Sequence, residues 1–344
     1  MGRDRLQGNA AYPAALRALQ AHPSIWPEGP EGEAQTSLPN PYTLREPAGR
    51  IVVGRRLPQL VVEVDEDMAS KPQGESASTA RYPQGYCAKI IAYFETRNAR
   101  VDAAFVSPYL QPGMHLLDCG CGPGTITVGL AEIVAPGRVV GVDFERGQVE
   151  KARALAAERS LTTVDVAVAD LFELPFPSHT FDAIFAHAVL QNVGDPTRAL
   201  REMHRVLKPG GIIGVRNVDQ GSNIYSPTDP LLDQAHALYF KRWKHIGGDP
   251  FGARHSRALL REAGFVNTKG SATTECWSTE DGIQSWGELF ASIVEAPTFS
   301  DHVIAQGWAD RPTVERIAAA LRAWGTHPDA FWARIYCEAI GWKR

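Results

Sequence analysis

The stretch His115-Leu-Leu-Asp-Cys-Gly-Cys-Gly-Pro-Gly-Thr125 predicts a strand, a glycine-rich turn and the first residue of a helix. Gly120, Gly122 and Gly124 carry no side chain where the backbone must turn sharply and approach a ligand closely. A dinucleotide-binding loop that starts at Gly120 would have a third glycine at the position of Thr125. The turn therefore departs from the dinucleotide pattern, although its glycines alone leave an NAD-dependent dehydrogenase open.

Strands and helices alternate on both sides of this turn. The order β-α-β-α predicts an α/β fold with a doubly wound, mostly parallel sheet. Ligands on such sheets bind outside the carboxyl ends of the strands. Seven strands are expected, at residues 114–117, 138–142, 164–168, 181–185, 211–215, 266–274 and 331–339. The helices that alternate with the first five are expected at 88–98, 125–134, 146–159 and 197–207.

Two kinds of extension surround this pattern. Residues 1–75 form an N-terminal extension that is partly irregular, with a β-hairpin expected over 51–64, and it could make a homodimer contact. Residues 76–344 form the main domain, with helical insertions at about 217–264 and 277–328. Both insertions are rich in aromatic residues and histidine, which suits a lid over an apolar pocket. The alternative is that these aromatic residues fill the core of a helical subdomain.

The composition of the chain argues against several kinds of binding partner. The 344 residues carry a net charge of −4 without a block of Lys or Arg, so nucleic acid is not expected as a partner. Neither a leading apolar run nor a bilayer-length apolar stretch is present, which predicts a cytoplasmic protein without a membrane partner. Five cysteines without framework spacing indicate reduced thiols, and the spacing Cys119-x-Cys121 is too tight for a zinc site, so no metal is expected.

Acidic residues follow three of the predicted strands. Asp118, Asp143 and Asp170 come at the carboxyl ends of the first, second and third strands. A carboxylate at position 143 can accept hydrogen bonds from both hydroxyls of a ribose, and one at position 170 could accept from an adenine amino group. A single acidic residue at such a place is often only a helix cap or a turn residue. Three acidic residues at the carboxyl ends of three successive strands favour a nucleoside site instead.

The same motifs carry a resemblance to a known family. The chain resembles the class I S-adenosylmethionine (SAM)-dependent methyltransferases, in particular the UbiE-like small-molecule branch. The motifs occur in the order and spacing of that family: Leu-Asp-Cys-Gly-Cys-Gly-Pro-Gly-Thr (117–125), Val-Val-Gly-Val-Asp (139–143), Ala-Asp-Leu (169–171), Phe-Asp-Ala-Ile (181–184) and Leu-Lys-Pro-Gly-Gly (207–211). The resemblance implies SAM as the cofactor and a Rossmann-like methyltransferase fold.

The resemblance also implies a role for individual residues. Asp118 and the turn from Gly120 to Thr125 would contact the aminocarboxypropyl part of SAM, and Asp143 would bind the ribose. His187 would lie near the sulfonium. The remaining residues expected around the adenosine or in a helix that closes over it are Phe144, Gln148, Asp170, Leu171 and Tyr86.

The chemistry expected is an in-line displacement that moves the methyl group to a small, apolar or aromatic organic acceptor. Holding the two reactants in near-attack geometry supplies most of the effect, and a general base is needed only if the acceptor loses a proton. His187 and His245 are the candidates for a catalytic role. The run His187-Ala-Val-Leu-Gln-Asn lacks the Pro-Pro-aromatic pattern of enzymes that methylate base amines. A protein that binds SAM but steers another reaction, such as a cyclisation, stays open.

Overall fold

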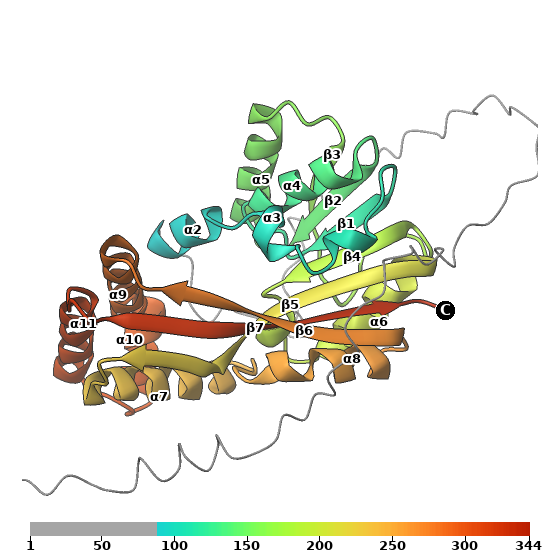
Figure 1. Ribbon diagram of the computed structural model, residues 1–344. Coiled ribbons are helices and arrows are strands. Elements are labelled where there is room, and N and C mark those ends of the chain that lie inside the picture. The colour runs from blue at the N-terminus through green and yellow to red at the C-terminus, as the bar shows by residue number, and fades with distance from the viewer. Residues whose placement is uncertain (1–87) are drawn as a thin grey trace, which may run out of the picture. The chain divides into compact units, whose positions relative to one another are not determined.

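The computed structural model of the chain describes residues 88–344 (Figure 1). The N-terminal extension, its expected hairpin, the expected homodimer contact and Tyr86 all lie outside the described residues. Within residues 88–344, no helix is both long and apolar enough to span a bilayer.

One seven-stranded sheet forms the centre of the described residues, in the order β3-β2-β1-β4-β5-β7-β6. β1 to β5 are parallel, and β7 runs antiparallel to both β5 and β6. The bounds are β1 His115–Cys119, β2 Arg138–Asp143, β3 Val164–Val168, β4 Phe181–His187, β5 Leu207–Ser226, β6 Val266–Trp277 and β7 Phe331–Trp342. The prediction of a mostly parallel seven-stranded sheet is therefore confirmed.

Helices cover both faces of this sheet because successive strand residues point to opposite sides. Leu116 packs in one core with Leu130, whereas its neighbour Leu117 packs in another core with Leu200. Leu130 belongs to α4 and Leu200 to α6. The helices that accompany the sheet are α3 Ala99–Asp102, α4 Thr125–Val134, α5 Arg146–Glu158, α6 Pro196–Val206 and α8 Ser256–Glu262. Three short 3-10 helices also belong to this part of the described residues: η2 Ser107–Tyr109, η3 Leu190–Asn192 and η4 Gly252–His255.

The sheet is longer on the β5–β7–β6 side than the sequence predicts. β5 continues past Arg216 to Ser226, and its residues 217–219 and 224–226 pair with β7. Residues 217–226, assigned from sequence to a helical insertion, are therefore strand, and α8 packs against β7 and β6 as an ordinary covering helix. Residues 217–226 form a strand because their backbone N–H and C=O groups pair with those of β7, more than a hundred residues later in the chain.

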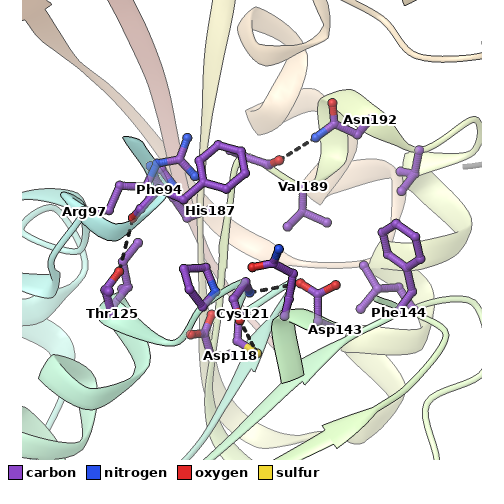
Figure 2. Close-up of a pocket in the computed structure, with 18 of the residues that line it drawn as sticks. Phe94, Arg97, Asp118, Cys121, Thr125, Asp143, Phe144, His187, Val189 and Asn192 are labelled. Atoms are coloured by element: carbon purple, nitrogen blue, oxygen red, sulfur yellow. Dashed lines mark hydrogen bonds between the residues drawn. The ribbon is translucent and has the colours of Figure 1, made fainter. Parts of the chain in front are cut away.

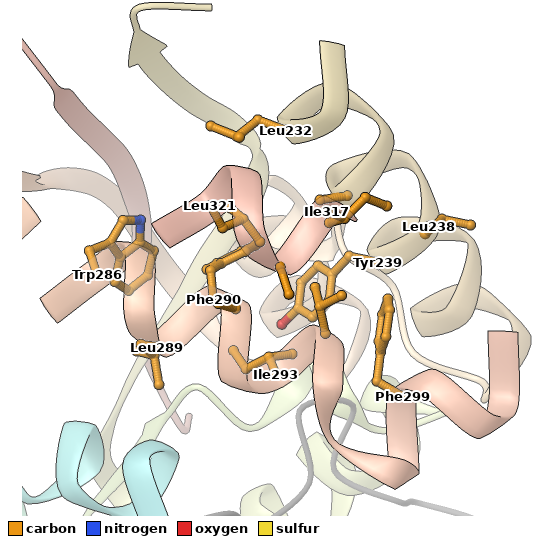
Figure 3. Packing of buried hydrophobic residues seen from close by; sticks show 14 of the residues in the cluster. Leu232, Leu238, Tyr239, Trp286, Leu289, Phe290, Ile293, Phe299, Ile317 and Leu321 are labelled. Carbon is orange, nitrogen blue, oxygen red and sulfur yellow. The ribbon is translucent and has the colours of Figure 1, made fainter. Parts of the chain in front are cut away.

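A helical subdomain lies at the far end of these long strands (Figure 1). It consists of α7 Pro230–His245, α9 Glu280–Glu295, α10 Pro297–Ala305 and α11 Arg311–Gly325, and α2 Ala88–Glu95 packs against α9. Its core includes Trp286, Phe290 and Phe299, which lie against aliphatic side chains in Figure 3. The aromatic residues of the insertions thus fill a helical core, which was the alternative reading of the sequence.

Candidate cofactor site

A cavity opens at the carboxyl ends of β1, β2 and β4, where the order of strands changes direction. It contains about 1060 Å³ of empty space, part of which is open solvent, so a cofactor-sized molecule can enter. Ten residues that the sequence nominated line it: Asp118, Gly120, Gly122, Thr125, Asp143, Phe144, Gln148, Asp170, Leu171 and His187.

The turn after β1 has left-handed backbone at all three glycines. The φ angles are 74° at Gly120, 54° at Gly122 and 86° at Gly124, a region that glycine adopts without strain. Gly124 is not among the residues that line the cavity. A Cβ at this position would lie 2.8 Å from the Cβ of Ala152 in α5, so the glycine permits close contact between α4 and α5. Gly124 therefore has a packing role, and its expected contact with the cofactor stays a prediction.

Asp143 links the glycine turn to the end of β2 by hydrogen bonds. Its Oδ2 accepts a hydrogen bond from the backbone N–H of Gly122 at 2.9 Å, and its Oδ1 accepts one from the N–H of Glu145 at 3.0 Å. Burial raises the pKa of Asp143. Each carboxylate oxygen keeps a further lone pair, so the group can still accept hydrogen bonds from a diol.

Asp118 is buried beneath the same turn. Its Oδ2 accepts a hydrogen bond from the hydroxyl of Thr127 at 2.6 Å, a partner on α4 that the sequence did not suggest. Burial raises the pKa of Asp118 to about 7, and the nearby carboxylate of Asp143 acts in the same direction. None of the ion pairs found within residues 88–344 involves Asp118. This acid can therefore compensate a positive charge on a ligand.

Two residues on the β2 side have features that fit a nucleoside. The ring of Phe144 is 52% exposed, although it is large and apolar, and it lines the cavity (Figure 2). Gln148 is 4% exposed, and its Oε1 has no hydrogen-bond partner within the described part of the chain. A flat ring system against Phe144 and a donor opposite Gln148 would satisfy both.

Asp170 and Leu171 line the cavity from the loop after β3. The Oδ1 of Asp170 accepts a hydrogen bond from the backbone N–H of Phe172 at 2.8 Å. The side chain is exposed, so it keeps room to accept from a ligand. Phe172 also lines the cavity, and the sequence did not nominate it.

His187 ends β4 and meets a buried charged cluster. Its Nε2 lies 2.7 Å from Nη1 of Arg216 on β5, and the same Nη1 donates to Oδ1 of Asp102 at 2.8 Å. Its Nδ1 is buried and has no hydrogen-bond partner among the residues described. Burial lowers the pKa of His187 to about 4. The ring is therefore neutral around pH 7.

His245 lies elsewhere. It ends α7, where its ring centroid is 5.0 Å from that of His302 and 5.4 Å from that of Trp308. It does not line the cavity. More generally, no lining residue comes from α7, α9, α10 or α11, so these helices do not form the expected lid. The aromatic insertions were expected to cover the site. The long strands β5, β6 and β7 instead place the helical subdomain to one side of it.

The opposite wall comes from α2 and the segment after β4. Phe94 and Arg97 line it, and the guanidinium of Arg97 lies 4.5 Å from the centre of the Phe94 ring. Val189, Asn192 and Val193 complete this wall. None of these residues was expected from the sequence, although Phe94 and Arg97, three positions apart in a predicted helix, could have suggested a shared face.

Comparisons with known proteins agree with this geometry. A family model described as a methyltransferase domain matches residues 110–282. A probable methyltransferase, ltbC of Aspergillus luteorubrus, is 31% identical over 285 residues, which cover 78% of this chain and 99% of that protein. Demethylmenaquinone methyltransferase of Staphylococcus aureus is 34% identical over 179 residues, 46% of this chain and 71% of that protein. The solved YcgJ protein of Bacillus subtilis has a TM-score of 0.49 at 17% identity, over 71% of this chain and 99% of that one.

The family match covers half of the chain and includes the glycine turn and all three strand-end carboxylates. This match excludes the alternative hypothesis of an NAD-dependent dehydrogenase, because the matched family and relatives are methyltransferases. The exposed Phe144, the unpartnered Oε1 of Gln148 and the uncompensated Asp118 fit SAM, which carries an adenosine and two positive charges. The chain belongs to the class I SAM-dependent methyltransferases.

Proposed function

We propose that this enzyme transfers the methyl group of SAM to a small, apolar or aromatic organic acceptor. The observation that carries the proposal is the set of strand-end carboxylates Asp118, Asp143 and Asp170, which line one cavity. Carboxylates are matched to the ammonium and the hydrogen-bond donors of SAM. The apolar side chains Phe94, Val189 and Val193 line the same cavity and suit an apolar acceptor.

In this proposal each part of the cavity holds one part of the cofactor. Asp118 and the backbone of the glycine turn contact the aminocarboxypropyl group. Asp143 accepts from the ribose hydroxyls, and Phe144 and Gln148 contact the adenosine. Asp170 accepts from the adenine amino group, and Leu171 packs against the adenine. Asp143 serves twice, because the carboxylate that meets the ribose also fixes the backbone of Gly122.

SAM supplies an electrophilic methyl group. The chain contributes orientation, since an in-line displacement accelerates greatly when the reacting atoms are held about 3–3.5 Å apart and aligned. Phe94 is buried and belongs to the core of the helical subdomain as well as to the cavity wall, so it excludes water on that side. We propose no role at the site for His245.

The test is to incubate the purified protein with methyl-labelled SAM and an extract of its source organism, and to identify the labelled product. We expect a labelled small molecule and an equal amount of S-adenosylhomocysteine. SAM that binds without any S-adenosylhomocysteine formed would instead favour a protein that uses the cofactor to steer another reaction, such as a cyclisation. The Asp143→Ala variant is the matched control, because it should bind SAM more weakly and form less labelled product at a limiting concentration of SAM.

A further inference from the structure

The charges around the cavity are segregated. The three carboxylates Asp118, Asp143 and Asp170 belong to the ends of β1, β2 and β3. Of the described residues, Arg97 is the charged one that lines the opposite wall, beside His187 and Phe94, as Figure 2 shows. Thr125 and Asn192, which also line the cavity, are uncharged. If SAM occupies the carboxylate side, the space left for the acceptor faces a positive charge.

His187 lines this space and has one buried ring nitrogen, Nδ1, without a partner among the described residues. A guanidinium has donors only, so the contact of 2.7 Å with Arg216 requires an unprotonated Nε2, and Oδ1 of Asp102 is the more distant neighbour of this nitrogen at 3.4 Å. A neutral imidazole then carries its proton on Nδ1. This Nδ1 has no partner within the described residues, and an unsatisfied buried donor is costly unless a ligand provides the acceptor.

Arg216 cannot easily turn away from His187. Its Nε donates to Glu338 at 3.3 Å, its Nη2 donates to the hydroxyl of Thr273 at 3.2 Å, and its guanidinium stacks 3.6 Å from the ring centre of Tyr336. Asp102 and Glu338 are both hydrogen-bonded to Arg216. Glu275, whose pKa the charge of Arg97 helps to lower, is ion-paired with Arg334. None of these three acids lines the cavity, so none directly opposes a negative charge inside it.

We propose that the acceptor binds as an anion, an enolate or phenolate of an acidic enol or phenol, with its oxygen facing Nδ1–H of His187 and the guanidinium of Arg97. This inference rests on the proposed methyl transfer and names its substrate class. Arg216 acts as a positioning residue, since its guanidinium keeps Nε2 of His187 unprotonated, and Asp102 in turn anchors Arg216. His187 is a donor in this arrangement and does not take a proton.

The transfer then balances without a general base. The electron pair of the anion forms the new bond to the methyl carbon, and the pair of the broken carbon–sulfur bond stays on sulfur. The proton of the enol or phenol is lost to solvent before binding. Burial lowers the pKa of His187 to about 4, and the charges of Arg97 and Arg216 act in the same direction against the pull of Asp102. A neutral His187 around pH 7 agrees with this assignment.

4-Nitrophenol is a suitable probe because its absorbance reports whether it is ionised. It would be titrated with the protein, with and without S-adenosylhomocysteine, at a pH near its own pKa. We expect the bound probe to shift toward phenolate, with its pKa lowered by about one unit, which is a tenfold preference for the anion. Nitrobenzene, of similar size but without the ionisable oxygen, should bind about tenfold more weakly than the phenolate.

Variants separate the contributions of Arg97 and His187 to the pKa shift of the bound probe. Arg97→Gln should abolish most of the shift, whereas Arg316→Gln, which removes an exposed charge on α11, should leave it unchanged. The amide nitrogen of Asn occupies nearly the place of Nδ1, and that of Gln the place of Nε2. His187→Asn should therefore keep more of the shift than His187→Gln. Labelling the histidines with ¹⁵N should show Nδ1 of His187 protonated in the wild type.

Several results would overturn the inference. These are an unchanged or raised pKa of the bound probe, equal binding of nitrobenzene, no binding by any probe in a series of acidic phenols and enols, or a proton on Nε2 of His187. Circular dichroism of each variant excludes unfolding as the cause. Failure of SAM and S-adenosylhomocysteine to bind would instead contradict the proposed function, and the probe can still be titrated against the unloaded protein.

Discussion

Nη1 of Arg216 lies 2.7 Å from Nε2 of His187 and 2.8 Å from Oδ1 of Asp102, so one NH2 group on β5 meets both the end of β4 and the end of α3. Arg216 itself is 3% exposed. The guanidinium therefore compensates the charges of Asp102 and Glu338 in a place that water does not reach. Removing one partner from such a cluster leaves uncompensated buried charge.

Arg216→Gln should lower the free energy of unfolding by about 3–5 kcal/mol, the cost of breaking a buried ion pair. Urea denaturation followed by circular dichroism measures this. The control is Arg311→Gln, whose ion pair with Asp301 is exposed on both sides and should contribute about 0–1 kcal/mol. Equal effects of the two substitutions would contradict the structural role of Arg216.

The strand-end carboxylates were predictable because a regular rule places them. In a parallel sheet all carboxyl ends meet at one edge, so Asp118, Asp143 and Asp170 had to come together once their strands were recognised. The glycine turn was equally readable, because left-handed backbone at Gly120 and Gly122 needs glycine. Local sequence carried both signals.

The environment of His187 was not predictable, because its partners are remote. Arg216 and Asp102 are 114 positions apart in the chain and meet only after the sheet and α3 pack. The continuation of β5 to Ser226 depends in the same way on β7. His245 was nominated for its residue type, but only tertiary packing decides that its ring lies against His302.

Asp143→Ala should weaken SAM binding by about 1–3 kcal/mol, the scale for losing charge-assisted hydrogen bonds. The loss includes an indirect part, since Gly122 loses the acceptor of its N–H. Isothermal titration calorimetry measures the affinity. Asp165→Ala is the matched control, because Asp165 lies on β3 with 58% of its side chain exposed. Unchanged affinity in Asp143→Ala would refute the assignment to the ribose.

We expect SAM binding to depend on pH through Asp118. Burial raises its pKa from 3.8 to about 7, so the folded protein holds a proton that the unfolded chain has lost. The contribution of this group to stability is fully present below about pH 4 and is lost as the pH rises through 7. The ammonium of SAM favours the carboxylate, so binding should release a proton when the pH is below about 7.

Calorimetry in two buffers of different ionisation enthalpy counts that proton. We expect release of up to one proton at about pH 6, and less as the pH rises through 7. Asp118→Asn keeps the shape but cannot ionise, so its binding should be weaker and release no proton. A wild-type protein that binds SAM at about pH 6 without proton release would show that Asp118 does not meet the ammonium.

Phe144→Ala should weaken SAM binding by about 0.5–1.5 kcal/mol, the value of an aromatic contact beyond its buried area. Because the ring is 52% exposed without a ligand, the free energy of unfolding should change little. Ile224→Ala removes an apolar side chain that is 61% exposed and does not line the cavity, and it should leave SAM affinity unchanged. Equal SAM affinity in Phe144→Ala and wild type would exclude stacking on the adenine.

Gly124→Ala should destabilise the fold by two separable effects. The φ of 86° is strained for alanine, and the new Cβ would lie 2.8 Å from Cβ and 2.9 Å from Cα of Ala152. Gly210→Ala isolates the first effect, because Gly210 has a φ of 78° with nothing within 4 Å of an added Cβ. We expect a loss of about 1 kcal/mol for Gly210→Ala and about 1–3 kcal/mol more for Gly124→Ala. Urea denaturation of both variants gives the difference. If the two losses are equal, close packing of α4 on α5 is not what requires glycine at position 124.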